Sequence, residues 1–147
     1  MINTVENMLH FYAQLRKFYI NEFTQRFQED SFSPNELDLM LFLHNNPSIN
    51  TASQLCTCLN VSKALVCRSV ESLTRRGFLA CEPDLCDRRI QHLHLTPDAD
   101  PVIEKLLSVR ETFDREIRRI ISPDDLRQME ETMDRILELF LNKTKGD

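Results

Sequence analysis

All five cysteines and two of the four histidines lie in the middle third of the chain, and they are the first candidates for chemistry. Cys81, Cys86, His92 and His94 share one short stretch, and the two histidines alternate as residues on one face of a strand would. The paired Cys-x-x-Cys spacing that is typical of structural zinc sites is missing. We therefore expect no metal site and no cofactor.

The thiols themselves are a second possibility. Their number is odd and the chain begins without a recognisable signal peptide, so we expect reduced thiols rather than disulfides. Cys67 precedes Arg68 and Cys86 lies close to Arg88, where positive charge favours the reactive thiolate, so these two are candidate redox residues. Cys56, Cys58 and Cys81 are expected to be packing residues.

Enzymatic chemistry is not indicated. With only two glycines, Gly77 and Gly146, the chain has almost no material for phosphate-cradling loops. No Ser-His-Asp order or paired carboxylates stand in a recognisable context, so we expect no catalytic residues.

The basic residues are distributed unevenly. The chain has a net charge of -5, yet residues 51–95 carry six Lys or Arg against four Asp or Glu, a net charge of +2. A basic segment between acidic flanks is what a localised surface for binding a polyanion would produce.

Four Ser or Thr residues mark helix starts that would position these groups. Ser33-Pro34-Asn35-Glu36 and Thr51-Ala52-Ser53-Gln54 have the spacing of capping boxes, and Thr96-Pro97 and Ser122-Pro123 place a proline in the first turn. Helices are therefore predicted to begin near residues 34, 52, 97 and 123. A further helix begins after Ser62, buries Val66, Val70 and Leu73, and ends at Gly77.

Two short segments, 78–82 and 90–95, read as an antiparallel hairpin, because residues Ile90 to Leu95 alternate between apolar and polar. Two short helices followed by a hairpin form a helix-turn-helix with a wing. The predicted fold is therefore mainly α with a small β-hairpin wing (α+β). In it a winged helix-turn-helix is flanked by N- and C-terminal dimerisation helices.

The helix after Ser62 would turn its outward face to the major groove of duplex DNA. Arg68 is the expected base reader, Lys63 a phosphate contact, and Arg88 or Arg89 would enter the minor groove from the wing. Asp87 would repel phosphate, so we expect it to hold Arg89 through a bidentate pair. The complete predicted DNA-binding set is Ser62, Lys63, Ala64, Leu65, Cys67, Arg68, Arg75, Arg76, Arg88 and Arg89.

Two motifs resemble the MarR-type family of bacterial regulators, named for multiple antibiotic resistance. The segment from Val61 to Leu79 is similar to the recognition-helix pattern of that family, and Asp87-Arg88-Arg89 followed by Leu95-Thr96 resembles its wing. Ala99 departs from the glycine that often follows Leu-Thr in the family. The resemblance implies a transcriptional regulator, expected to be a repressor, that binds a pseudo-palindromic site in double-stranded DNA as a homodimer.

The apolar stripes at the two ends of the chain support a dimer. Val5, Leu9 and Tyr12 line a first helix, and Leu126 to Phe140 line the last; a small winged-helix core cannot cover both. We expect a single domain over 1–147, with a DNA-binding lobe at 34–95 and a helical dimerisation region at 1–30 and 97–147.

The sequence does not identify an effector. His10, Tyr12, Arg16, Tyr19 and His44 are candidates for lining a pocket for an unidentified small molecule. No stretch is long and apolar enough for a membrane span, so no membrane partner and a cytoplasmic location are expected. The alternative function is a winged-helix module that binds proteins and not DNA.

Overall fold

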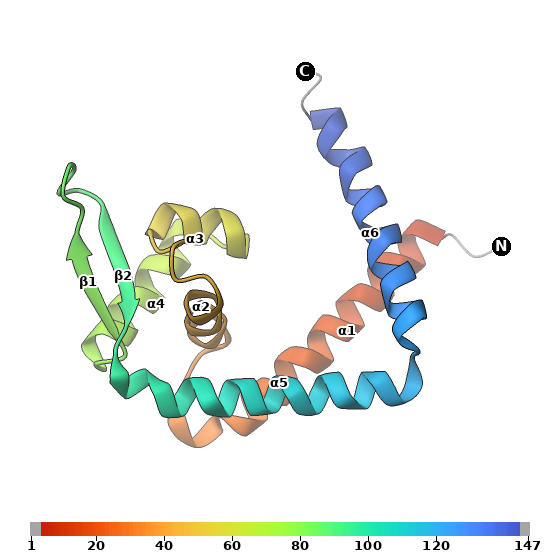
Figure 1. Cartoon of the computed structure of the whole chain (residues 1–147), viewed down its shortest axis with the longest axis horizontal. Helices are drawn as coiled ribbons and strands as arrows, with labels where there is room; N and C mark the ends of the chain where they lie inside the picture. The colour runs from red at the N-terminus through yellow and green to blue at the C-terminus, as the bar shows by residue number, and fades with distance from the viewer. Residues whose placement is uncertain (1–3, 145–147) are drawn as a thin grey trace. The chain divides into compact units, whose positions relative to one another are not determined.

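The computed structural model describes residues 4–144, which are mostly helical with one two-stranded hairpin (Figure 1). The elements in chain order are α1 (Thr4–Arg26), η1 (Gln28–Asp30), α2 (Pro34–Asn45), α3 (Ala52–Leu59), α4 (Lys63–Arg75), β1 (Leu79–Pro83), β2 (Gln91–Leu95), η2 (Pro97–Ala99), α5 (Asp100–Ile120) and α6 (Pro123–Thr144). The chain divides into two compact units, one up to Val109 and the other from Arg110. The predicted fold class is confirmed.

Three of the four predicted helix starts are confirmed by their capping bonds. The backbone N–H of Glu36 donates to Ser33 Oγ at 3.2 Å, and Glu36 Oε2 accepts from the Ser33 N–H at 2.7 Å. Gln54 and Thr51 form the equivalent reciprocal pair before α3. Ser122 Oγ accepts from the Asp125 N–H at 3.2 Å at the start of α6.

The fourth predicted helix start, near residue 97, differs from the observed one. Residues Pro97–Ala99 form a 3₁₀ turn, and the α-helix begins at Asp100. Thr96 does not cap it, because its hydroxyl donates instead to the carbonyl of Gly77 at 2.6 Å.

The end of α4 follows the predicted glycine signal. Gly77 has φ +84°, in the left-handed region, where a side chain would be strained. The N–H of Phe78 donates to Leu73 O at 2.9 Å and that of Gly77 to Thr74 O at 3.1 Å, which is the Schellman pattern. This closure turns the chain directly from α4 into β1.

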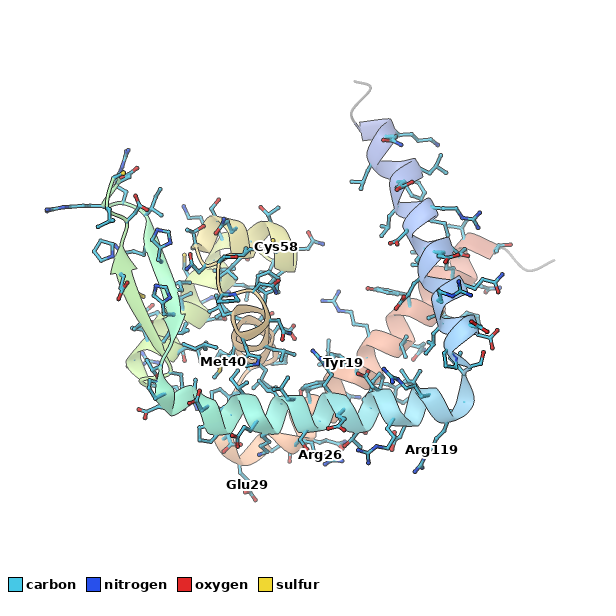
Figure 2. All side chains as sticks on the ribbon, viewed as in Figure 1. Tyr19, Arg26, Glu29, Met40, Cys58 and Arg119 are labelled. Carbon is cyan, nitrogen blue, oxygen red and sulfur yellow. The ribbon has the colours of Figure 1, made fainter. Side chains whose placement is uncertain are left out.

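The hydrophobic core of the first unit lies between the end of α1, α2, α3, α4, the hairpin and the first half of α5. Its side chains that are almost completely buried are Phe27, Leu39, Met40, Leu55, Val66, Leu73 and Leu106. The packing of these side chains against one another holds α3 and α4 together as a helix-turn-helix. Charged residues such as Glu29 project to solvent (Figure 2).

The hairpin joins the helix-turn-helix at its open edge. β1 and β2 are antiparallel, with Leu79 opposite Leu95 and Glu82 opposite His92. The other edge of β2 contacts the residues just before α3: the N–H of Leu93 donates to Asn50 O at 2.8 Å, and Thr51 forms a bridge with His92.

The second unit consists of the end of α5 and α6. None of the α6 side chains that the structure describes is buried, and Met129, Leu137 and Phe140 are exposed. Within residues 4–144, no helix combines the length and apolar character needed to cross a bilayer.

Candidate nucleic-acid interface

The outward face of α4 carries most of the predicted DNA-binding residues. Ser62 is the N-cap of the helix, its Oγ accepting from the Leu65 N–H at 3.2 Å. Val66 and Leu73 are buried and Val70 is half-buried, as the helical periodicity predicts. The predicted contact residues left exposed are Ser62, Lys63, Ala64, Cys67, Arg68 and Arg75, with Leu65 half-buried at the margin. Glu71 and Thr74 of the same helix are exposed as well.

One buried residue of this helix was missed. Ser69 is only 6% exposed and lies in the inward row, three positions after Val66. Its polar type obscured the position, although helical spacing from Val66 could have revealed it.

The exposed cations of α4 remain available for a ligand. Arg68 Nε donates to Ala64 O at 3.4 Å, which orients the side chain along its own helix. Within residues 4–144, no acidic side chain forms an ion pair with Lys63, Arg68 or Arg75. These three groups can therefore meet phosphate or base edges without first breaking an ion pair.

Arg76 was also predicted to contact phosphate, but its partly exposed guanidinium is engaged by other parts of the chain. Nη2 donates to Asp30 O at 2.6 Å and Nη1 to Ser31 O at 3.3 Å, and the group stacks 4.1 Å above the Phe32 ring. Glu36, which is buried, lies 3.7 Å from Nη1. Arg76 thus joins the end of α4 to the segment before α2, and we withdraw it from the proposed interface.

The wing contains the ion pair that the sequence predicts. Arg89 Nε donates to Asp87 Oδ1 at 3.1 Å and Nη2 to Oδ2 at 3.3 Å. The pKa of Asp87 is lowered by these bonds and by the Arg89 N–H, so its carboxylate stays ionised at neutral pH. Arg88, next in the loop, is exposed and forms no ion pair within residues 4–144.

A polar network at the base of the wing was not foreseen. His92 Nδ1 lies 2.8 Å from Asn50 Oδ1, and Nε2 lies 2.8 Å from Asp84 Oδ1. The pKa of Asp84 is lowered to about 2, first by the hydrogen bond from His92 and then by the N–H groups of Cys86 and Asp87. No sequence signal pairs Asn50 with His92, since 42 residues separate them.

The cysteines are all free, and their exposure corrects part of the prediction. Cys58 and Cys81 are exposed rather than packed, whereas Cys56 is half-buried. Cys67 and Cys86, the candidate redox residues, are exposed. Cys56, Cys67 and Cys81 line one open groove between α3, α4 and the hairpin.

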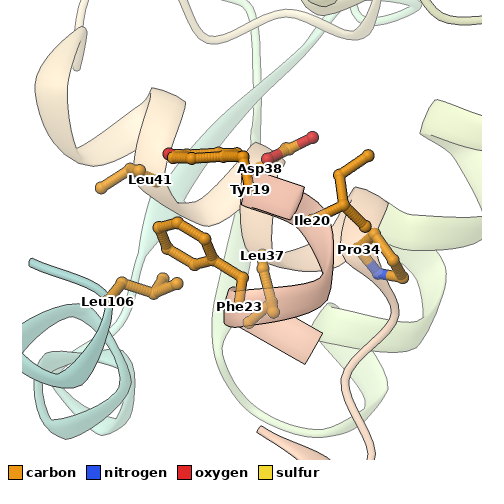
Figure 3. A pocket seen from close by; sticks show the side chains of 8 residues that line it. All are labelled: Tyr19, Ile20, Phe23, Pro34, Leu37, Asp38, Leu41 and Leu106. Atoms are coloured by element: carbon orange, nitrogen blue, oxygen red, sulfur yellow. The ribbon is translucent and has the colours of Figure 1, made fainter. Parts of the chain in front are cut away.

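The residues proposed for an effector pocket are only partly brought together. Tyr19 lines a small, mostly apolar pocket with Phe23, Leu37 and Asp38 (Figure 3). Burial raises the pKa of Asp38, and the charge of Arg16 opposes that shift. The other four candidates, His10, Tyr12, Arg16 and His44, are exposed and do not line this pocket.

Comparison with known proteins supports the architecture. A MarR family model matches residues 31–90, which confirms the resemblance noted from the motifs. The solved structure of the transcriptional regulator PA3341 is 21% identical, with 92% of this chain and 98% of that chain covered and a TM-score of 0.82. The MepR–DNA complex from S. aureus is 13% identical, covering 89% and 96%, with a TM-score of 0.77. The solved structure of MarR is 18% identical, with 100% of this chain and 99% of that chain covered and a TM-score of 0.72. Each of these likenesses shows a shared fold.

Proposed function

We propose that this chain, whose residues 31–90 match a MarR family model, is a sequence-specific regulator that binds double-stranded DNA. The observation that carries the proposal is the outward face of α4. Its small and cationic side chains are exposed on a helix whose other face is locked into the core. A rigid helix that presents cations and small groups is the element that enters a major groove.

The proposed contacts rest on the position of each side chain on this face. Arg68 points from the first half of α4 and is assigned to a guanine edge, while Lys63 and Arg75 are assigned to phosphates on either side. In the wing, Asp87 orients Arg89, and the exposed Arg88 is assigned to the adjacent minor groove. The lobe that makes these contacts is assigned to residues 34–95.

We further propose that the active form is a homodimer. On α1, the side chains of Val5, Leu9, Phe11, Tyr12, Leu15 and Phe18 are all at least 50% exposed. Exposed apolar side chains at this density favour burial against a second copy, and a two-fold axis would make the surface self-complementary. Two recognition helices about 34–36 Å apart would then read a pseudo-palindromic operator.

In this role the protein would repress transcription by occupying its operator and be released by a small molecule or by thiol oxidation. The exposed thiols of Cys67 and Cys86 lie where an added oxygen or adduct would meet DNA. The pocket beside Tyr19 has a volume of only about 10 Å³, so a small molecule could bind there only if the pocket opened.

Fluorescence anisotropy tests the proposal directly. Purified protein is titrated into the duplex upstream of its own gene, and into a duplex recovered by in vitro selection from random DNA, across a salt series. Tight binding that weakens steeply with salt and exceeds binding to random DNA supports a sequence-specific regulator. Failure of in vitro selection to enrich any sequence would overturn it in favour of a protein-binding module.

The dimer and the release mechanism are tested in the same preparation. Sedimentation equilibrium should give twice the chain mass, and Leu15→Glu together with Phe18→Glu should give the single-chain mass. A single-chain mass for the unmodified protein would refute the dimer. Loss of binding with peroxide, absent in Cys67→Ser with Cys86→Ser, would assign release to these thiols, whereas peroxide-insensitive binding would exclude it.

A further inference from the structure

His92 occupies an unusual position between the wing and the helix-turn-helix. Its half-buried ring has one nitrogen 2.8 Å from Asn50, directly before α3, and the other 2.8 Å from Asp84, at the first turn of the wing loop. Asn50 is itself buried at 8% exposure. The ring is therefore a side-chain bridge between the segment just before α3 and the start of the wing loop.

Both neighbours of the ring offer hydrogen-bond acceptors. The amide nitrogen of Asn50 donates to Pro47 O at 3.2 Å, which leaves its Oδ1 facing His92 Nδ1. Asp84 presents a carboxylate oxygen to Nε2. A neutral imidazole has one N–H, so it can satisfy only one of these contacts, whereas the imidazolium donates to both.

The bridge leads to the residues assigned to the minor groove. The second oxygen of Asp84, Oδ2, accepts from the N–H of Cys86 at 2.9 Å and from that of Asp87 at 3.0 Å. Asp87 in turn holds Arg89. An ordered Asp84 thus organises the loop, and His92 is the side chain that orders Asp84.

We propose that His92 is a positioning residue for DNA binding, and that its protonated ring holds the wing against the helix-turn-helix. The proposal rests on the DNA-binding function proposed above. Only the imidazolium can donate to both acceptors, so the complete bridge requires the protonated ring and loses one of its two contacts when the ring gives up its proton. Asp84 is ionised at neutral pH, because its pKa is lowered to about 2.

Other titratable groups near the ring are distinguishable from it. Glu82 is opposite His92 in the strand register, and its carboxylate lies 3.6 Å from His94 Nε2. His44 on α2 lines a separate pocket together with His94. His94 has a single, longer contact and an exposed side chain, so it is the matched control for His92.

Two measurements separate the bridge from the DNA-binding function. The first, without DNA, follows hydrogen exchange of the Cys86 and Asp87 amides by NMR between about pH 5 and pH 8, corrected for intrinsic exchange rates. Their protection should fall with rising pH in the unmodified protein and in His94→Gln. In His92→Gln the protection of both amides should be independent of pH. It should be about fivefold lower than in the unmodified protein at the low end of the pH range.

The second measurement is anisotropy with the duplex recovered by in vitro selection, over the same pH range at constant salt. The affinity of the unmodified protein and of His94→Gln should decline with pH, and that of His92→Gln should be weaker and flat. Unchanged amide protection in His92→Gln, or a pH dependence removed by His94→Gln instead, would overturn the inference. If the amides respond as expected but no duplex is bound, the bridge stands and the DNA-binding function fails.

Discussion

Replacing Arg76 by alanine should destabilise the protein, although the side chain belongs to an Arg-Arg pair at the end of the recognition helix. The change removes charged hydrogen bonds to Asp30 O and Ser31 O, at 2.6 and 3.3 Å, and a stacking contact at 4.1 Å from the Phe32 ring. Hydrogen bonds to charged groups contribute about 1.5–3 kcal/mol, and a partly buried cation–π contact about 1 kcal/mol.

The expected loss is smaller than the sum of all the contacts. The Arg76 side chain is 28% exposed, so water screens its 3.7 Å ion pair with Glu36 and can solvate the freed carbonyls. We therefore expect Arg76→Ala to lower the free energy of unfolding by about 2–4 kcal/mol. Arg76→Lys should recover only part of this loss, because an ammonium cannot reproduce the planar fork or the stacking.

Arg75 is the matched control, because it is adjacent, cationic and exposed. Urea denaturation should show a change of less than about 0.5 kcal/mol for Arg75→Ala. In DNA binding the order should reverse: Arg75→Ala should reduce the salt-dependence slope by about one, and Arg76→Ala should leave that slope unchanged. Equal stability losses for the two variants, or a reduced slope for Arg76→Ala, would refute the assignment.

Four further substitutions test the interface and the core. Arg68→Ala should weaken binding to a selected duplex by about 1–3 kcal/mol and relax the base preference of the protein. Lys63→Ala should instead weaken binding to every duplex by a similar amount. Equal losses for Arg68→Ala on selected and random DNA would exclude a base-reading role. Asp87→Ala should leave the melting temperature unchanged but weaken DNA binding, because Arg89 loses its two carboxylate contacts. DNA binding that is unchanged by anisotropy would exclude a role for Asp87 in positioning Arg89. Leu73→Ala should lower stability by about 2–5 kcal/mol in urea denaturation, because Leu73 is completely buried, and a loss below about 1 kcal/mol would mean that the core can close around the space.

Features that depend on neighbouring residues were predictable from the sequence. The Ser33 and Thr51 caps bond to residues three positions away, and the Asp87–Arg89 pair spans two positions. At such separations the chain has few alternative arrangements, so residue type and spacing determine the contact. The same holds for Gly77, whose left-handed conformation ends α4.

Features that depend on distant partners were not predictable. Arg76 reaches carbonyls 45 and 46 residues away, and no pattern in the sequence distinguishes it from Arg75. Adjacent helical residues point about 100° apart, so one of two neighbouring arginines can meet the core edge while the other meets solvent. His92 and Asn50 are likewise joined only because β2 lies beside the residues before α3.

Thr96 shows how a distant partner can override a local signal. Thr96-Pro97-Asp98 carries the features of a helix start, and a free hydroxyl there would be expected to cap the next helix. Thr96 instead bonds to the segment that follows α4. Its hydroxyl donates to Gly77 O at 2.6 Å, and its N–H donates to Phe78 O at 3.0 Å. With its cap residue engaged, the chain forms a 3₁₀ turn before α5 begins at Asp100. The cap signal is therefore correct about where a helical segment starts, and the long-range bond decides which kind of turn starts it.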